Sequence, residues 1–292
     1  MKSGVCEKDM PRHHYVPQFM LDHWADNGQL RAFSWNADAE RVLKQSVAVR
    51  KACQIEDLNA VYGATGANRD IVEDTLTKEI DTPASAVLAD ILSKGVNHLS
   101  DDQRRVWARF LIAFAARTPE TLREMGPDET RKGFAAAAKA GDTPEAREFL
   151  DDFFTKQMSA LERNVPLNIA LDLTADPAQI APVLAMSWWI RRFDEPKVLL
   201  GDRPLLSGPR SRFPCGMPLN DPTCLISLPI SPRAIFFASA DRRVRAQQRV
   251  MQPSRLLRLV NDETIVRAAD YVYSADPTMA DMLTHALAKR ET

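Results

Sequence analysis

The chain has 292 residues, of which 45% are hydrophobic and 26% are charged, and these fractions exclude the disordered, collagen-like and disulfide-scaffold classes of protein. The 38 basic and 39 acidic side chains nearly cancel, so any nucleic acid or membrane would have to bind to a local patch of charge. Four cysteines without a CxxC pair, no signal-peptide core and no apolar run of about 20 residues favour a cytoplasmic protein without a membrane segment.

The N-terminal third is predicted to form a buried segment followed by a hairpin. Residues 12–24, RHHYVPQFMLDHW, combine histidines with aromatic and apolar side chains. Turn residues then precede two strand-like runs, over residues 29–35 and 41–49. Apolar positions at helical spacing predict a helix over residues 69–92, in which Pro83 causes a kink or a restart that Thr82 caps.

The middle of the chain is predicted to be helical almost throughout. Ser100-Asp101-Asp102-Gln103 is a capping-box pattern that predicts a helix beginning after Ser100. Further helices are expected over residues 120–139, 144–170 and 176–185. In the second of these, the apolar side is formed by Phe149, Phe153, Met158 and Leu161.

After residue 187 the pattern changes to short strands, in SWWIRRF, KVLL, TCLISLPI and AIFFAS, before a closing helical part over residues 261–290. These elements predict one α+β domain over residues 1–292. Its helical block, about residues 69–186, would pack on a small sheet built from the N-terminal hairpin and the C-terminal strands. A weak sub-boundary is expected near residues 172–187.

The residues 13–19, HHYVPQF, followed by Leu21, resemble the opening signature of a bacterial family called the domain of unknown function 4238 family. The resemblance continues in order along nearly the whole chain. It includes residues 52–62, the acid pair Glu73 and Glu79, FLIAFAARTP over 110–119, Trp189, Asp202-Arg203-Pro204, LPISP over 228–232, and Asn261.

Similar members usually have Ser-Asp-Asn-Pro where this chain has Gly201-Asp202-Arg203-Pro204, so a hydroxyl and an amide are lost while the carboxylate remains. The resemblance implies a collinear architecture and candidate positions, but no reaction. On these grounds the candidate catalytic residues are His13, His14, Gln18, Asp202 and Asn261.

The His13-His14 pair is the sharpest local feature. Adjacent residues on an extended segment point to opposite sides, so one imidazole can face a cleft while the other packs. A divalent metal is one candidate cofactor, with His14 and Asp202 as the preferred ligands and His23, Glu73 and Asn261 as further candidates. Alternatively, the histidines and Gln18 only satisfy buried backbone groups and anchor the N-terminus.

Two nuclease patterns are partly present. His-His-x-x-Pro is similar to the first motif of ββα-metal nucleases; Asn36 is available for the second, but the downstream histidine is missing. Glu195-Pro196-Lys197 resembles the Glu-x-Lys end of another nuclease motif, for which a surface turn is the simpler interpretation. The signatures of serine hydrolases, zincins, P-loop and Rossmann proteins do not occur.

Residues 242–258, RRVRAQQRVMQPSRLLR, contain six arginines and no acidic residue. Arginine suits phosphate and carboxylate oxygens, so Arg242, Arg243, Arg245 and Arg249 are candidate ligand-binding residues for nucleic acid or another phosphate-bearing ligand. The alternative is a solvated helix face whose arginines pair with nearby acids.

Three hypotheses therefore remain open. The first is an intracellular hydrolase, a phosphodiesterase or nuclease, in which His13 or His14 is the base or a metal ligand and Asp202 is a ligand or orienter. The second is a non-catalytic polyanion-binding protein that uses the arginines of residues 242–258. The third is a structural or protein-interaction module in which the histidine motif only anchors the fold.

Overall fold

The computed structural model describes residues 11–36, 38–125, 132–133, 136, 139, 143–207 and 224–290. Its helices and antiparallel strands confirm the predicted α+β class. The α-helices are α1 (Gln18–Leu21), α2 (Ile71–Thr75), α3 (Thr82–Lys94), α4 (Asp101–Ala116), α5 (Pro119–Glu124), α7 (Pro144–Ala175), α8 (Pro177–Ala185), α9 (Arg242–Val250), α10 (Pro253–Arg267) and α11 (Ala280–Arg290). The strands are β1 (Arg12–His14), β2 (Gln29–Asn36), β3 (Arg41–Ala48), β4 (Gln54–Glu56), β5 (Ser187–Arg192), β6 (Leu200–Gly201), β7 (Leu206–Ser207), β8 (Leu225–Ser231), β9 (Ala234–Ser239) and β10 (Val272–Tyr273).

The described strands form three antiparallel sheets. The pair β1–β4 stands alone, and the hairpin β2–β3 continues through β10 to β6, so the predicted sharing of a sheet between the hairpin and C-terminal strands holds for β6 and β10. The other C-terminal strands form a third sheet in the order β5–β9–β8–β7, which the sequence did not predict. All six residues of β9 are buried, so this sheet needs cover on both faces.

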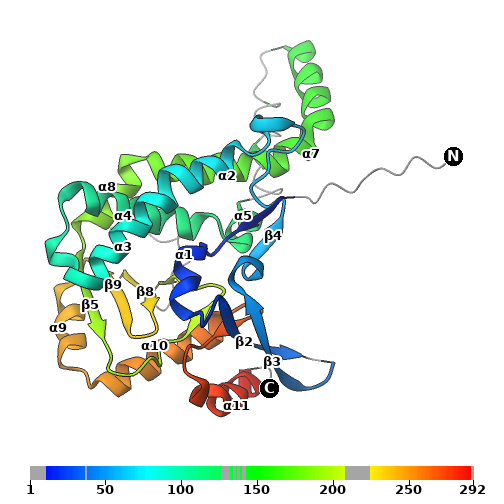
Figure 1. Cartoon of the computed structure of the whole chain (residues 1–292). Helices are drawn as coiled ribbons and strands as arrows, with labels where there is room; N and C mark the ends of the chain where they lie inside the picture. The colour runs from blue at the N-terminus through cyan, green and yellow to red at the C-terminus, as the bar shows by residue number, and fades with distance from the viewer. Residues whose placement is uncertain are drawn as a thin grey trace.

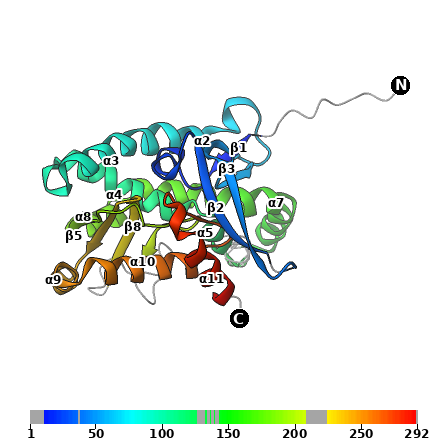
Figure 2. The same ribbon diagram turned by 60° about the horizontal axis from the view of Figure 1, so that its bottom comes forward.

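That cover comes from two layers of helices. Figures 1 and 2 show the third sheet between the helices α3 and α4 on one side and α9 and α10 on the other. Phe236 of β9 packs edge-on against Trp107 of α4 and Trp188 of β5, with ring centroids 5.7 and 5.5 Å apart. Trp24 is buried as well, as expected for a core tryptophan, and its Nε1 donates to the Val198 carbonyl at 2.8 Å.

The helical segment around Pro83 is continuous but contains a π-helical turn, η4 (Leu76–Asp81), between α2 and α3. Proline lacks an N–H and cannot close the regular helical ladder, so the wider turn accommodates it. The predicted capping by Thr82 is wrong, because the chain stays helical there and the Thr82 hydroxyl instead donates to the Thr77 carbonyl at 2.9 Å. The capping box of Ser100 and Gln103 is confirmed at the start of α4.

Two helix predictions need correction, and a third is tested only in part. Phe149 and Phe153 are 68% and 45% exposed rather than packed, because the N-terminal half of α7 extends beyond the body of the molecule (Figure 1). Of the expected helix over residues 120–139, half of the residues are described: α5 and the isolated positions 132, 133, 136 and 139 are helical there, and the other half lies outside the described residues. The C-terminal helical part begins at Pro253 rather than Asn261 and is interrupted by β10. None of the described helices is long and apolar enough to cross a bilayer.

Candidate functional site

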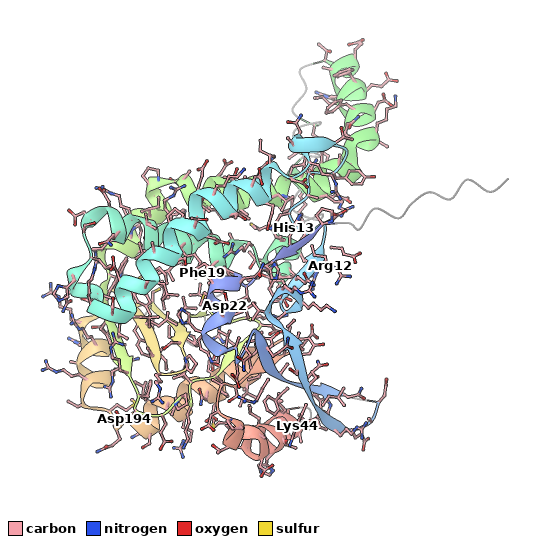
Figure 3. All side chains as sticks on the ribbon, viewed as in Figure 1. Arg12, His13, Phe19, Asp22, Lys44 and Asp194 are labelled. Carbon is pink, nitrogen blue, oxygen red and sulfur yellow. The ribbon has the colours of Figure 1, made fainter. Side chains whose placement is uncertain are left out.

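His13 lies on β1 (Figure 3) and connects this strand to the loop after β4. It lies opposite Ile55 of β4 and is 3% exposed. Its Nδ1 accepts a hydrogen bond of 2.8 Å from the backbone N–H of Asn59. Since Nδ1 is an acceptor, a neutral His13 carries its ring proton on Nε2. This arrangement supports the anchoring role for one of the two histidines.

His14 has a different environment. It is half-buried, and its Nε2 is buried without a hydrogen-bond partner among the described residues. Burial lowers the pKa of His14 below its ordinary value, although Glu73 and the backbone of Val49 and Arg50 raise it in part; Arg117 lowers it further. Since Nε2 has no partner among the described residues, we assign these backbone hydrogen bonds to Nδ1. A neutral imidazole with a free Nε2 lone pair is the form that a general base requires.

Glu73 of α2 acts electrostatically on His14 and is itself held by Asn59 of the loop after β4. Asn59 Nδ2 donates to Glu73 Oε2 at 2.7 Å. Asn59 is 1% exposed, and its Oδ1 has no hydrogen-bond partner in the described part of the chain. Glu79 lies on another face of the same helical segment, as its spacing from Glu73 predicts, and is exposed.

Arg117, at the C-terminal end of α4, brings a buried positive charge to the site. The guanidinium is 2% exposed, and its Nη1 lies 2.9 Å from Asp81 Oδ2. Its Cζ is 5.4 Å from the ring centroid of Phe114. Within the described structure, Nε and Nη2 of Arg117 and Oδ1 of Asp81 are buried without a hydrogen-bond partner. The free Nε–Nη2 edge presents two parallel donors, the geometry that binds a carboxylate or phosphate in bidentate fashion.

We call His14, Asn59, Glu73, Asp81 and Arg117 the His14 cluster. Among the described residues, eight buried side-chain nitrogen and oxygen atoms lack a hydrogen-bond partner, and five of the eight belong to this cluster. Buried polar atoms are nearly always hydrogen-bonded, and leaving one unpaired costs about 1–3 kcal/mol. Ordered water or a bound polar molecule supplies the partners of such atoms, so the His14 cluster is the candidate binding site for a polar molecule.

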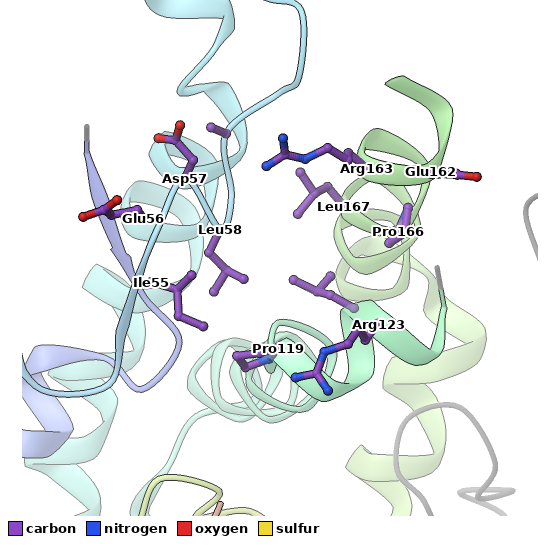
Figure 4. A pocket seen from close by; sticks show the side chains of 12 residues that line it. Ile55, Glu56, Asp57, Leu58, Pro119, Arg123, Glu162, Arg163, Pro166 and Leu167 are labelled. Carbon is purple, nitrogen blue, oxygen red and sulfur yellow. The ribbon is translucent and has the colours of Figure 1, made fainter. Parts of the chain in front are cut away.

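A pocket of about 350 Å³ lies beside the His14 cluster in the sequence (Figure 4). It is lined by the loop after β4, which carries Asn59, and by the start of α5, just after Arg117. Asn59 stands between two of its lining residues, Leu58 and Ala60, and Arg117 comes two residues before a third, Pro119. Between the loop and the helices α5 and α7, the pocket is lined by Ile55, Glu56, Asp57, Leu58, Ala60, Pro119, Leu122, Arg123, Glu162, Arg163, Pro166 and Leu167.

The Asp202 carboxylate binds backbone N–H groups and is not part of the His14 cluster. Asp202 is 0% exposed, and its carboxylate accepts three backbone N–H groups: Oδ1 from Ala269 at 2.7 Å, and Oδ2 from Asp270 at 2.6 Å and Tyr271 at 2.9 Å. Burial raises the pKa of the Asp202 carboxyl, and these N–H groups bring it part of the way back. Asp202 thereby shapes the turn between α10 and β10.

Asn261 and Gln18 are also separate from the His14 cluster. Asn261 is 4% exposed in α10; its Oδ1 accepts from the Leu199 N–H at 3.1 Å, and its Nδ2 donates to the Lys197 carbonyl at 2.9 Å. Both ends of its amide therefore clamp the segment leading into β6 onto α10. Gln18 is exposed at the first residue of α1.

The described residues do not support a metal site. No three histidine, cysteine, aspartate or glutamate side chains among them come together in a group that could hold a metal ion. His14 and Asp202, the preferred metal ligands, have different neighbours. His14 interacts with Glu73 and Arg117, whereas the Asp202 carboxylate binds the backbone of residues 269–271.

Cys53 belongs to a third environment, beside Tyr15 and Tyr273. Its Sγ lies 3.3 Å from the Tyr273 hydroxyl, and burial raises the pKa of the Cys53 thiol to about 12. A thiol that stays protonated at neutral pH is not a nucleophile. Cys224 is also buried, while Cys6 and Cys215 lie outside the described residues.

Asn36, Glu195 and Lys197, from the two nuclease patterns, make side-chain contacts with near neighbours in the sequence. Asn36 Oδ1 accepts the Ala39 N–H at 2.7 Å, which forms the turn of the β2–β3 hairpin. Lys197 Nζ pairs with the Glu195 carboxylate two residues away, and both side chains are at least one third exposed. Both observations agree with turn residues.

The predicted ligand-binding arginines lie on α9. Arg242, Arg245 and Arg249 line a second pocket, of about 810 Å³, together with residues of β5, whereas Arg243 is exposed outside it. The structure therefore brings three of the four predicted arginines together, far along the chain from the histidines.

Asn59, Asp81 and Arg117 were not among the sequence candidates. Asn59 and Arg117 do fall inside two stretches that carry the family resemblance, residues 52–62 and 110–119. The sequence does contain a signal for Arg117, because this arginine ends the apolar run FLIAFAAR. A charged residue at the end of a buried helix needs a buried partner.

The family comparison agrees with this architecture. The model of the family described as a protein of unknown function, DUF4238, matches residues 12–278, so the chain belongs to that family. The matched range begins at β1 and ends after β10, and it contains every residue of the His14 cluster. Comparison with curated proteins gives no match, and comparison with solved structures gives none either.

Proposed function

We propose that this chain is a cytoplasmic hydrolase that cleaves a phosphodiester at the His14 cluster. The proposal rests on one observation: five buried atoms of His14, Asn59, Asp81 and Arg117 have no hydrogen-bond partner among the described residues. A neutral base, a carboxylate beside it and a half-used guanidinium are the groups that hydrolysis of an anionic ester requires.

Each group has a defined role in the proposed reaction. The Nε–Nη2 edge of Arg117 binds two non-bridging phosphate oxygens. Nε2 of His14 accepts a proton from water as the water oxygen bonds to phosphorus, and the bond from phosphorus to the leaving oxygen breaks. The proton on His14 then passes to the leaving alcohol. Glu73 stabilises the imidazolium that forms in between, because its carboxylate raises the His14 pKa.

The test uses three chromogenic probes: bis(p-nitrophenyl) phosphate, p-nitrophenyl phosphate and p-nitrophenyl acetate. We expect the wild type to hydrolyse the diester best, and His14→Gln to lower kcat at least 100-fold with an unchanged melting temperature. His98→Gln is the matched control, since His98 is exposed at the end of η5 (Val96–His98). This control should keep the wild-type rate.

The pH dependence provides a second readout. Because only neutral His14 accepts a proton, the rate should fall with decreasing pH through a pKa below the ordinary histidine value of about 6.5. Absence of hydrolysis with all three probes would overturn the proposal. A folded His14→Gln protein with the wild-type rate would do the same.

A further inference from the structure

The groove between α9 and the edge strand β5 carries an isolated concentration of positive charge. It is about 810 Å³ in volume, within the range of pockets that hold small ligands. Four of its eight lining residues are arginines and none is acidic; they are Trp189, Ile190, Arg191, Arg242, Arg245, Ala246, Arg249 and Val250.

Arg242, Arg245 and Arg249 share one face of α9, because they are three and four residues apart. Successive rises of about 4.5 and 6 Å separate them along the helix axis. No ion pair involves any of these three arginines in the part of the chain that the structure describes. Among the described residues, this helix face is therefore solvated, as the alternative expects, but it is not paired with acids.

Arg191 and Trp189 of β5 hold this helix in position. Arg191 donates to the carbonyls of Gln248, Arg249 and Met251, the last at 3.3 Å, and so satisfies the C-terminal end of α9. Trp189 Nε1 donates to Gln248 Oε1 at 3.0 Å. These contacts occupy Arg191 and leave the other three arginines on a rigid support, which lowers the entropic cost of binding a ligand.

The aromatic content of the groove argues against recognition of nucleobases. Trp189 is 7% exposed and stacks on Phe237 with 5.6 Å between ring centroids, so its face is not open to a base. The remaining apolar lining is aliphatic, from Ile190, Ala246 and Val250. Charge, rather than stacking, is what the groove offers to a ligand.

We propose that this groove binds a small ligand carrying two or more linked phosphate groups, through Arg242, Arg245 and Arg249. Linked phosphates present several oxygens along a line, and each guanidinium can bind a pair of them. The proposal does not depend on the hydrolase reaction, because the groove and the His14 cluster have no residue in common.

The experiment is isothermal titration calorimetry of the full chain with inorganic tripolyphosphate, with orthophosphate and with a single-stranded 20-nucleotide DNA. We expect tripolyphosphate to bind at least tenfold more tightly than orthophosphate, and Arg242→Gln plus Arg245→Gln to weaken it at least tenfold. Arg243→Gln, on the same helix but outside the groove, is the matched control and should bind like the wild type. All three substituted side chains are exposed, so the melting temperatures should agree.

Two outcomes would overturn the proposal. The first is no binding of tripolyphosphate to the wild type; if the DNA binds in that case, the surface belongs to a polymer. The second is an equal loss in Arg243→Gln and in the double variant, which would indicate general attraction to the basic residues 242–258.

Discussion

Replacement of Asp202 by asparagine tests whether this carboxylate is structural or belongs to a reaction. Its two oxygens accept three backbone N–H groups, from Ala269, Asp270 and Tyr271. Asparagine keeps one acceptor oxygen and turns the other into an N–H₂ donor. In either orientation of the amide, at least one backbone N–H then faces a donor instead of an acceptor.

The magnitude follows from the number of hydrogen bonds lost. If the remaining oxygen stays with Asp270 and Tyr271, only the Ala269 N–H is unpaired, at a cost of about 1–3 kcal/mol. We therefore expect Asp202→Asn to lower the free energy of unfolding by about 2 kcal/mol. For a chain of 292 residues, whose unfolding entropy is about 2.1 cal/mol/K per residue, that corresponds to roughly 3 °C in melting temperature. Asp202→Ala unpairs all three groups and should cost more, about 4 kcal/mol.

Equilibrium urea denaturation and thermal melting of the purified variants measure these differences. Asp194→Asn is the control, because Asp194 is exposed in the turn after β5 (Figure 3) and should change the unfolding free energy by less than about 0.5 kcal/mol. If Asp202→Asn melts like the wild type but loses turnover of the diester probe, the structural reasoning is wrong and Asp202 belongs to the reaction.

Three further predictions concern the His14 cluster and its anchor. Burial lowers the pKa of His14 in the folded state, so the unfolded state binds the proton more tightly and the wild type should lose stability as pH falls from about 7 to 5. His14→Gln should lose less over this range in urea titrations, and equal losses would contradict the lowered pKa. Arg117→Lys keeps a charge for Asp81 but loses the bidentate edge, so the KM for the diester probe should rise at least fivefold in steady-state kinetics; an unchanged KM would remove Arg117 from binding. His13→Ala leaves the Asn59 N–H unpaired and should lower the unfolding free energy by about 2 kcal/mol in urea, whereas a variant as stable as wild type would refute the anchor.

The elements that the sequence predicted well are those set by neighbouring residues. The capping box at Ser100 and Gln103 and the two strands of the hairpin depend on contacts within a few positions, so their patterns can be read locally. The division of the strands into three sheets depends on pairing between distant segments. Val272 lies between Phe33 and Gly201, and nothing in the local spacing of a two-residue strand specifies such partners.

The candidate site was predicted only in part, for a related reason. His14 stands in a recognisable motif, but Asn59, Asp81 and Arg117 reach it through three separate elements. Asp202 attracted notice because a carboxylate in a turn is typical of functional loops. The same residue type is also typical of turns that need an acceptor for backbone N–H groups, and only the three-dimensional contacts distinguish the two uses.

The position of β10 between β2 and β6 has a consequence for synthesis of the protein on the ribosome. The hairpin is translated well before its neighbour at residues 272–273, which follows more than 200 residues later in the chain. Until then the outer backbone of β2 is an unpaired strand edge, which invites pairing with another nascent chain. Chains that end before residue 272 keep this edge permanently, so they should accumulate as aggregates rather than as shortened folded proteins.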